Sequence, residues 1–250
     1  MATRISDLKV DLHVHTCLSP CADLSMTPAV AVARARELGF DGLAICDHNS
    51  AENVPAARRA AEGTGLEVLG GMEITSSEEV HVLGIFGTDE ALRQMQETVY
   101  ANLPGKNDET YFGRQIVMNE NDEAVDACDR LLIGATTMGI TEVVSCIKAL
   151  GGIAIASHVD RDSYSLIGQL GIVPEDLALD ALGLSFRCLA AGKQKSYEVW
   201  GLPLVSGSDA HFPSELGRSF TVVHAENASF EELAAALARD GVAVGSALRS

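Results

Sequence analysis

Eight short apolar runs are spaced along the chain, with polar residues or glycines between them. They cover residues 9–14, 42–46, 66–72, 80–86, 152–157, 181–185, 202–206 and 219–224. Within each run the apolar residues are nearly continuous, which is typical of strands in a parallel sheet that is covered on both faces. We therefore predict strands of a parallel sheet at these positions.

Between these runs, apolar residues recur with helical spacing. Thr27 and Pro28 form a typical helix start, with proline at the first helical position, and Gly39 is a typical stop. Ser229 and Glu232 have the spacing of a capping box for a helix over 230–240. Further helices are predicted over 52–63, over 89–102, and from a cap at Thr141 to near Gly151. The alternation of strands and helices predicts an α/β fold, either a barrel or an open parallel sheet.

Residues 103–140 interrupt this alternation between the fourth and fifth strands. They contain the stretch GRQIVMNENDEAVDA, which predicts a hairpin that turns near residues 119–122. A long excursion inside a compact domain is more typical of a lid or flap than of a second domain. We therefore expect one domain over residues 1–250, with residues 103–140 as a flap.

Composition narrows the classes of function. The chain has 250 residues, of which 47% are hydrophobic, enough for one large domain with a core. Its 18 basic and 35 acidic side chains give a net charge of −17, which disfavours general nucleic-acid binding but allows a small anionic substrate in a locally positive pocket.

Because we find no membrane-length apolar run and no secretory signal pattern, we expect a cytoplasmic protein without membrane association. The apolar runs are all shorter than the roughly 18 residues of a membrane span, and the N-terminal stretch MATRISDLKVDLH lacks the apolar core of a secretory signal. The six cysteines form no CxxC pair, so we expect reduced thiols, with Cys46 and Cys146 in the core.

Six of the seven histidines lie at the ends of the predicted strands, together with acidic residues. His81 differs from the others because it sits near the start of its apolar run. A single histidine at a strand end is more often a hydrogen-bonded structural residue than a ligand. The set comprises His13, His15, Asp47, His48, Glu73, His81, His158, Asp209 and His211.

The geometry of a parallel barrel or sheet turns this set into a candidate site. All carboxyl ends of the strands lie on one face, and residues i and i+2 of a strand point the same way, roughly 6.6 Å apart. His13 and His15 can therefore converge on one cation. Imidazoles and carboxylates suit Zn²⁺, Mn²⁺ or Fe²⁺, and so many donors exceed the needs of one ion. We predict two or three ions, with Glu73 able to bridge a pair.

The motifs DLHVHTCLSP, ICDHN, GMEIT, VHVLG, ASHVDR and SGSDAH, taken together and in this order, resemble those of the PHP (polymerase and histidinol phosphatase) metal-dependent phosphoesterases. The resemblance covers residues 9–212. It implies a distorted, TIM-like (β/α)7 barrel with a dinuclear or trinuclear metal centre.

The resemblance also implies a ligand set. His13, His15, Asp209 and the bridging Glu73 would hold the first metal, Glu73, His81 and His158 the second, and His48 and His211 the third. Many family members have a further His or Asp ligand several residues after the HxH motif. This chain has Cys21 there, with Asp23 close by, and we take Cys21 as the expected ligand; the alternative is a small buried thiol in a tight turn. Asp47 is expected to orient its neighbours.

The implied reaction is hydrolysis of a phosphate ester, with a metal-bound hydroxide as nucleophile. Asp209 and His211 would be catalytic. Arg161 and Arg218 would bind the phosphate, since guanidinium groups bind it bidentately, and Arg114 and Arg130 in the flap are weaker candidates. His224 is expected to be structural. The expected substrate is a small phosphorylated metabolite or a nucleotide, and nucleic acid is expected only as short oligonucleotide ends.

Two other functions stay open. The first is amide or lactone hydrolysis by an amidohydrolase-like barrel, which also begins with HxH but typically bridges its metals with a carboxylated lysine. No lysine lies at a strand end between Lys9 and Lys148, which disfavours this reading. The second is a non-catalytic metal-binding or regulatory module, which a damaged ligand set would favour.

Overall fold

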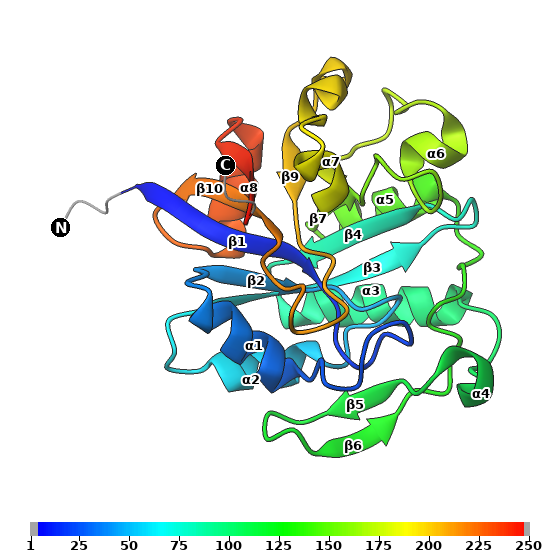
Figure 1. Cartoon of the computed structure of the whole chain (residues 1–250). Helices are drawn as coiled ribbons and strands as arrows, with labels where there is room; N and C mark the ends of the chain where they lie inside the picture. Colours follow the sequence, from blue (N-terminus) through cyan, green and yellow to red (C-terminus); the bar gives the residue numbers. More distant parts are fainter. Residues whose placement is uncertain (1–4, 248–250) are drawn as a thin grey trace.

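The computed structural model describes residues 5–247, and its centre is a nine-stranded sheet that curls into a nearly closed barrel (Figure 1). The spatial order is β11-β10-β1-β2-β3-β4-β7-β8-β9. The strands are β1 (Ser6–Val14), β2 (Gly42–Ile45), β3 (Glu67–Thr75), β4 (His81–Phe86), β7 (Ile153–Ala156), β8 (Ala181–Leu184), β9 (Leu204–Ser206), β10 (Ser219–Ala225) and β11 (Val242–Ser246).

The segment after β9 returns along β1 and brings the two ends of the strand order together. The Asp209 N–H donates to the His13 carbonyl at 2.8 Å, and the His15 N–H donates to the Ala210 carbonyl at 3.1 Å. On the other side, the Ser206 N–H donates to the Thr221 hydroxyl at 2.9 Å. The predicted α/β barrel is confirmed, with nine strands in its sheet where the family resemblance implied seven and the apolar runs predicted eight.

The prediction of a parallel sheet is wrong for β4 and β10, and the strand β11 was not predicted. β4 runs antiparallel to β3 and β7, β10 runs antiparallel to β1, and β11 runs antiparallel to β10. Only residues 76–80 separate β3 from β4, whereas a parallel crossover needs about a dozen residues or more. As a consequence, the start of β4 lies beside the carboxyl end of β3, and His81 pairs with Thr75.

The helices follow the predicted pattern closely. The longer ones are α1 (Pro28–Glu37), α2 (Val54–Ala61), α3 (Asp89–Asn102), α5 (Ile140–Ala149) and α8 (Phe230–Ala238). α1 and α2 lie side by side (Figure 1). The shorter ones are α4 (Glu109–Phe112), α6 (Leu166–Leu170), α7 (Phe186–Ala190) and the 3-10 helix η1 (Gln194–Trp200).

The three N-terminal helix caps that we predicted have different outcomes. The Thr27 hydroxyl accepts from the Val30 N–H, so the predicted cap of α1 is confirmed. The predicted cap at Thr141 is wrong, because the cap lies two residues earlier at Gly139, which has no side chain to offer, and α5 begins at Ile140. At α8, Ser229 accepts from the Glu232 N–H, but the Glu232 carboxylate turns to the Glu226 N–H, so the capping box is half formed.

Residues 103–140 contain the predicted hairpin, built from β5 (Ile116–Met118) and β6 (Ala124–Ala127). It forms a separate two-stranded sheet below α2 (Figure 1). The Ile116 N–H donates to the Cys17 carbonyl at 3.0 Å, and Asn53 bonds the Ile116 carbonyl and the Met118 N–H. The hairpin is thus attached to the loop after β1, and its role as a lid stays a prediction.

Apolar layers cover both faces of the sheet. One buried cluster lies under α1, α2, α3 and α5, and the other joins successive strands and reaches α8. Cys46 is fully buried as predicted, whereas Cys146 is half-buried. Over residues 5–247, no helix is long and apolar enough to cross a membrane.

Candidate metal centre

The strand-end residues that sequence analysis singled out converge at one end of the barrel. β1 contributes His13 and His15, β3 contributes Glu73, and β4 contributes His81 from its first position. The loops after β2, β7 and β9 contribute His48, His158, and Asp209 with His211. Apart from His211, these residues are at most 8% exposed.

Glu73 lies at the middle of the cluster. Its Oε1 is 3.3 Å from His13 Nε2, 3.1 Å from His81 Nδ1 and 3.2 Å from His158 Nε2. Its Oε2 is 3.4 Å from His15 Nε2 and 3.2 Å from His48 Nδ1. One carboxylate therefore faces five imidazoles, the position that a bridging ligand requires.

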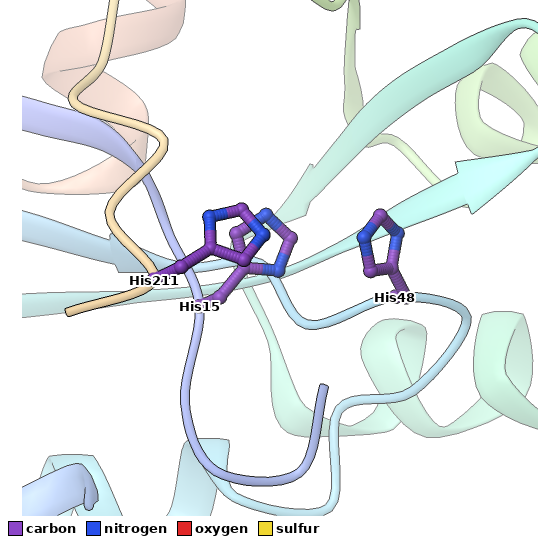
Figure 2. Close-up of side chains that lie close together, drawn as sticks. All are labelled: His15, His48 and His211. Carbon is purple, nitrogen blue, oxygen red and sulfur yellow. The ribbon is translucent and has the colours of Figure 1, made fainter. Parts of the chain in front are cut away.

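Asp209 closes the cluster on the side of β9. Its Oδ1 is 3.1 Å from His15 Nε2 and 3.6 Å from His13 Nε2. Three groups of donors have their ligand atoms within 4.8 Å of one another. They are His13 with His15 and Asp209, His48 with Glu73 and His81, and His15 with His48 and His211, of which Figure 2 shows the last.

The donor chemistry of this cluster fits divalent cations. The Nδ1 atoms of His48 and His81, which face Glu73, and the Oε1 atom of Glu73 are buried and have no hydrogen-bond partner. Buried polar atoms without partners cost about 1–3 kcal/mol each, and a cation that accepts their lone pairs removes this cost. Imidazole and carboxylate donors suit Zn²⁺, Mn²⁺ and Fe²⁺.

The charges in the cluster match the forms that bind metal. Burial alone would raise the pKa of Glu73, but the imidazoles of His81, His13 and His48 lower it well below its usual range. Burial opposes ionisation of Asp209 in the same way, and His13 and His15 lower its pKa well below the usual value. Both carboxylates are therefore anionic at neutral pH.

Three of the imidazoles, those of His15, His48 and His158, are held neutral. Burial and the neighbouring His211 lower the pKa of His15 to about 4. Burial also lowers the pKa of His48 and of His158. His13 differs, because Glu73 and Asp209 outweigh the effect of burial and raise its pKa. Neutral imidazole and ionised carboxylate are the protonation states that coordinate a cation.

Ser19 and Asp47 orient the imidazoles from behind. The Ser19 hydroxyl lies 3.0 Å from His15 Nδ1, donates to Asp47 at 2.6 Å and accepts from the His48 N–H at 3.1 Å. Asp47 also accepts the Thr16 N–H at 2.6 Å. These bonds direct His15 Nε2 toward Glu73. Sequence analysis missed Ser19; its only signal was a hydroxyl four residues after His15, inside the motif that carried the family resemblance.

Two of the candidate ligands have strained backbones. His158 has φ of 30° and Asp209 has φ of 50°, in the left-handed region that residues other than glycine seldom adopt. Such conformations cost about 1–3 kcal/mol each and cluster at functional sites. At Asp209, the N–H bond to the His13 carbonyl holds the strained residue against β1.

A cavity of 580 Å³ opens beside Asp209. Its lining includes four cationic side chains, Arg161, Arg187, Lys193 and Arg218. Arg161 pairs with the Asp209 carboxylate. Arg218 donates to the Ser208 carbonyl at 2.8 Å and pairs with Glu215 at 2.9 Å, so it supports the Asp209 loop from behind. The lining also includes four carboxylates, so cationic and anionic side chains are equal in number there; they are Asp160, Asp162, Asp209 and Glu215.

The other sequence candidates fall at different distances from the cluster. Cys21 Sγ is 3.1 Å from His211 Nε2, at the exposed rim, and Cys21 belongs to none of the three donor groups found among residues 5–247. Arg114 pairs with Glu109, and Arg130 stacks on Tyr100. His224 pairs with Asp7 on the surface, outside the cluster. Neither flap arginine lines the cavity beside Asp209.

Comparison with known proteins places the chain in a family. A family model described as PHP domain matches residues 11–162, more than half of the chain, and one described as PHP-associated matches residues 194–241. The chain is 25% identical to a 5'-3' exoribonuclease of Haemophilus influenzae, over 86% of this chain and 95% of that protein. A shorter match, 33% identical over 30% of this chain and 29% of the relative, is to a phosphoribosyl 1,2-cyclic phosphate 1,2-diphosphodiesterase of Eggerthella lenta.

The fold is shared with solved structures. A lesion-specific endonuclease of Pyrococcus furiosus superposes with a TM-score of 0.66 at 18% identity. The superposition covers 96% of this chain and 58% of that chain, so this chain corresponds to about half of the endonuclease. The predicted enzyme class, a metal-dependent phosphoesterase, is confirmed. The chain belongs to the PHP-domain family, as its strand-end motifs predicted.

Proposed function

We propose that this chain hydrolyses a phosphoester whose phosphate lies between the metal centre and the arginines of the cavity beside Asp209. The observation that carries the proposal is the position of Asp209, which belongs to a metal-donor group and also lines the cavity. The site thus joins metal donors to cationic side chains that can bind an anion. We propose the residues of the cluster as the metal ligands, namely His13, His15, His48, Glu73, His81, His158, Asp209 and His211.

The chain's own residues divide the work. Divalent cations, when bound, would act as Lewis acids and lower the pKa of bound water. Glu73 is proposed to bridge two of them, because both of its oxygens face imidazoles. His13, His15 and Asp209 would complete one site, and His81 and His158 another. His48 and His211 face a third, since they share a donor group with His15.

The two arginines have different proposed roles. Arg161 reaches the Asp209 carboxylate from the cavity side and is 41% exposed, so it can turn its free N–H groups to a phosphate. Arg218 is held by Glu215 and by the carbonyls of Ser208 and Asp209. We assign Arg161 to phosphate binding and Arg218 to positioning Asp209.

A phosphate-release assay tests the proposal. Protein loaded with Mn²⁺, Zn²⁺ or Fe²⁺ is expected to hydrolyse p-nitrophenyl phosphate, a mononucleotide or bis-p-nitrophenyl phosphate. His13→Ala and Asp209→Ala should abolish turnover, while His224→Ala, a histidine outside the cluster, should keep it. Cleavage of amides or lactones alone, or no turnover by the metal-loaded protein on any ester, would contradict the proposal and favour the amidohydrolase-like or non-catalytic alternative.

A second candidate substrate is the 5' end of an RNA strand. It is favoured by the match to an exoribonuclease, which spans 86% of this chain and 95% of the relative. The net charge of −17 argues against binding along a phosphate backbone, whereas a strand end needs only the local cations of the cavity. A 5'-phosphorylated oligoribonucleotide, assayed beside a mononucleotide, separates the two candidates by which is cleaved with the higher kcat/KM.

A further inference from the structure

The loop after β1 is fastened to His211 by its backbone. The Asp23 N–H donates to the His211 carbonyl at 2.9 Å. Within the loop, the Ala22 N–H donates to the Ser19 carbonyl at 3.0 Å and the Cys17 N–H to the Met26 carbonyl at 2.7 Å. These bonds fix the loop around Cys21, whose Sγ lies 3.1 Å from His211 Nε2.

Of the two metal-binding residue types in this loop, only the thiol faces the cluster. The Asp23 carboxylate is exposed and accepts from both the N–H and the hydroxyl of Ser25, at 2.9 and 2.5 Å. It is therefore turned into its own loop. Cys21 makes its contact with His211 instead.

The neighbouring imidazoles have free lone pairs. His211 Nδ1 lies 2.9 Å from the Asp209 carbonyl, which can only accept, so Nδ1 carries the proton and Nε2 presents its lone pair toward Cys21. His48 shares a donor group with His211, is 4% exposed, and its Nδ1 has no hydrogen-bond partner. The thiol of Cys21 thus contacts one imidazole, His211, which shares a donor group with His48.

We propose that Cys21 is a thiolate ligand of the third metal ion, together with His48 and His211. This inference rests on the proposed metal centre, and it adds that the metal positions differ in which ion they prefer. Soft thiolate ligands select Zn²⁺ or Fe²⁺, whereas carboxylate ligands suit Mn²⁺. The third position therefore prefers Zn²⁺, Fe²⁺ or Co²⁺, while the positions that Glu73 and Asp209 share accept Mn²⁺.

Cobalt substitution tests the ligand directly, because a thiolate bound to Co²⁺ gives a charge-transfer band in the near ultraviolet. We expect the band in the Co²⁺-loaded protein and in Cys128→Ser, a cysteine beside Tyr100 and outside the cluster. Cys21→Ser should lose the band and one bound ion per chain. Cys21→Asp should lose the band and regain the third ion, now with Mn²⁺ accepted.

A second readout needs no variant. Zn²⁺ should slow alkylation of Cys21 by iodoacetamide, measured by peptide mass spectrometry, and leave the alkylation of Cys128 unchanged. Circular dichroism confirms that each variant used above is folded.

The outcomes separate this inference from the proposed centre. Co²⁺ bound without the thiolate band, or equal alkylation of Cys21 with and without Zn²⁺, overturns the role of Cys21 and leaves the metal centre standing. A protein that binds no Co²⁺ at all overturns both. A Cys21→Ser variant that keeps the band and the ion count also overturns the role of Cys21.

Discussion

The hydroxyl group of Ser19 orients the imidazole of His15 in the metal centre. Ser19 accepts from one backbone N–H, donates to Asp47 and contacts His15 Nδ1, so it links two candidate ligands to one buried carboxylate. A ligand histidine whose second nitrogen is held in this way binds metal more tightly, and loss of such a partner typically costs 10–100-fold in affinity.

The variant Ser19→Ala is therefore expected to bind Mn²⁺ or Zn²⁺ about 10–100-fold more weakly while staying folded. Isothermal titration calorimetry measures the affinity. Ser25→Ala is the matched control, since Ser25 lies in the same loop but donates only to the exposed Asp23. Equal metal affinities for the two variants would show that Ser19 does not orient His15.

The sequence predicted the ligand candidates better than it predicted their supports. Strand-end histidines and carboxylates are rare enough as a set to be recognised, and their family resemblance is confirmed. A serine after HxH carries no such signal, because serines are common in turns and the partner Asp47 lies in the loop after another strand, β2. Arg161 and Arg218 were expected to act alike, and only their contacts separate them.

At the scale of elements, short connections control strand direction and distant side chains complete helix ends. The start of α5 has Gly139 at its cap, and the Ile140 N–H donates to Glu78 at 2.9 Å, from the turn between β3 and β4. Burial alone would raise the pKa of Glu78, but hydrogen bonds from Ser76, the backbone and Ser77 lower it. A carboxyl whose pKa is lower in the folded state stabilises the fold at pH values above its unfolded-state pKa. That contribution is lost as the pH falls through the folded-state pKa.

Glu78→Gln should therefore lower the free energy of unfolding by about 1 kcal/mol at neutral pH, where the cap is ionised. The difference from wild type should shrink below a pH of about 4, where the unfolded carboxyl is protonated. Urea denaturation at both pH values measures it, with Glu79→Gln, its exposed neighbour, as the control. A difference that does not change with pH would mean that the charge of Glu78 has no part in the cap.

At this scale, the sequence predicts features that depend on neighbouring residues and misses those that depend on residues far along the chain. Thr27 caps its own helix and was predictable from two adjacent residues, whereas the cap of α5 comes from 62 residues away. The apolar run of β4 was recognised, but apolar runs do not reveal direction. The position of His81 at the start of its run and the short connection before it were the signs that β4 is reversed.

At the scale of the molecule, barrel closure assembles the site from both ends of the chain. His13 and Asp209 lie 196 positions apart and become neighbours through the bond between their backbones. Several of the buried donor atoms around them have no hydrogen-bond partner. Metal binding should therefore stabilise the whole fold.

Chelation with EDTA is expected to lower the Tm, and added Mn²⁺ to raise it. A cation at about 1,000 times its Kd contributes about 4 kcal/mol, and each kcal/mol shifts the Tm of a chain of this size by about 2–4 °C. Glu73→Gln should reduce the response to Mn²⁺ in a thermal shift assay. An identical Mn²⁺ response in Glu73→Gln would exclude Glu73 as a bridge.

The hairpin of residues 103–140 gives a further prediction. None of its residues belongs to a donor group, but Gly113 approaches the Pro20 carbonyl in the loop that carries Cys21. Deleting residues 112–126 is expected to change substrate preference and to leave the metal count unchanged, as measured by mass spectrometry of metals. Loss of the metals on deletion would mean that the segment is part of the core.

Anomalous diffraction from crystals grown with Mn²⁺ or Zn²⁺ tests the metal centre most directly. The account predicts at least two anomalous peaks within the cluster, one of them bonded to Asp209 and His13, with Glu73 between the peaks. Well-ordered crystals without a peak at bonding distance from Glu73 and Asp209, at a metal concentration that saturates binding in solution, would contradict it.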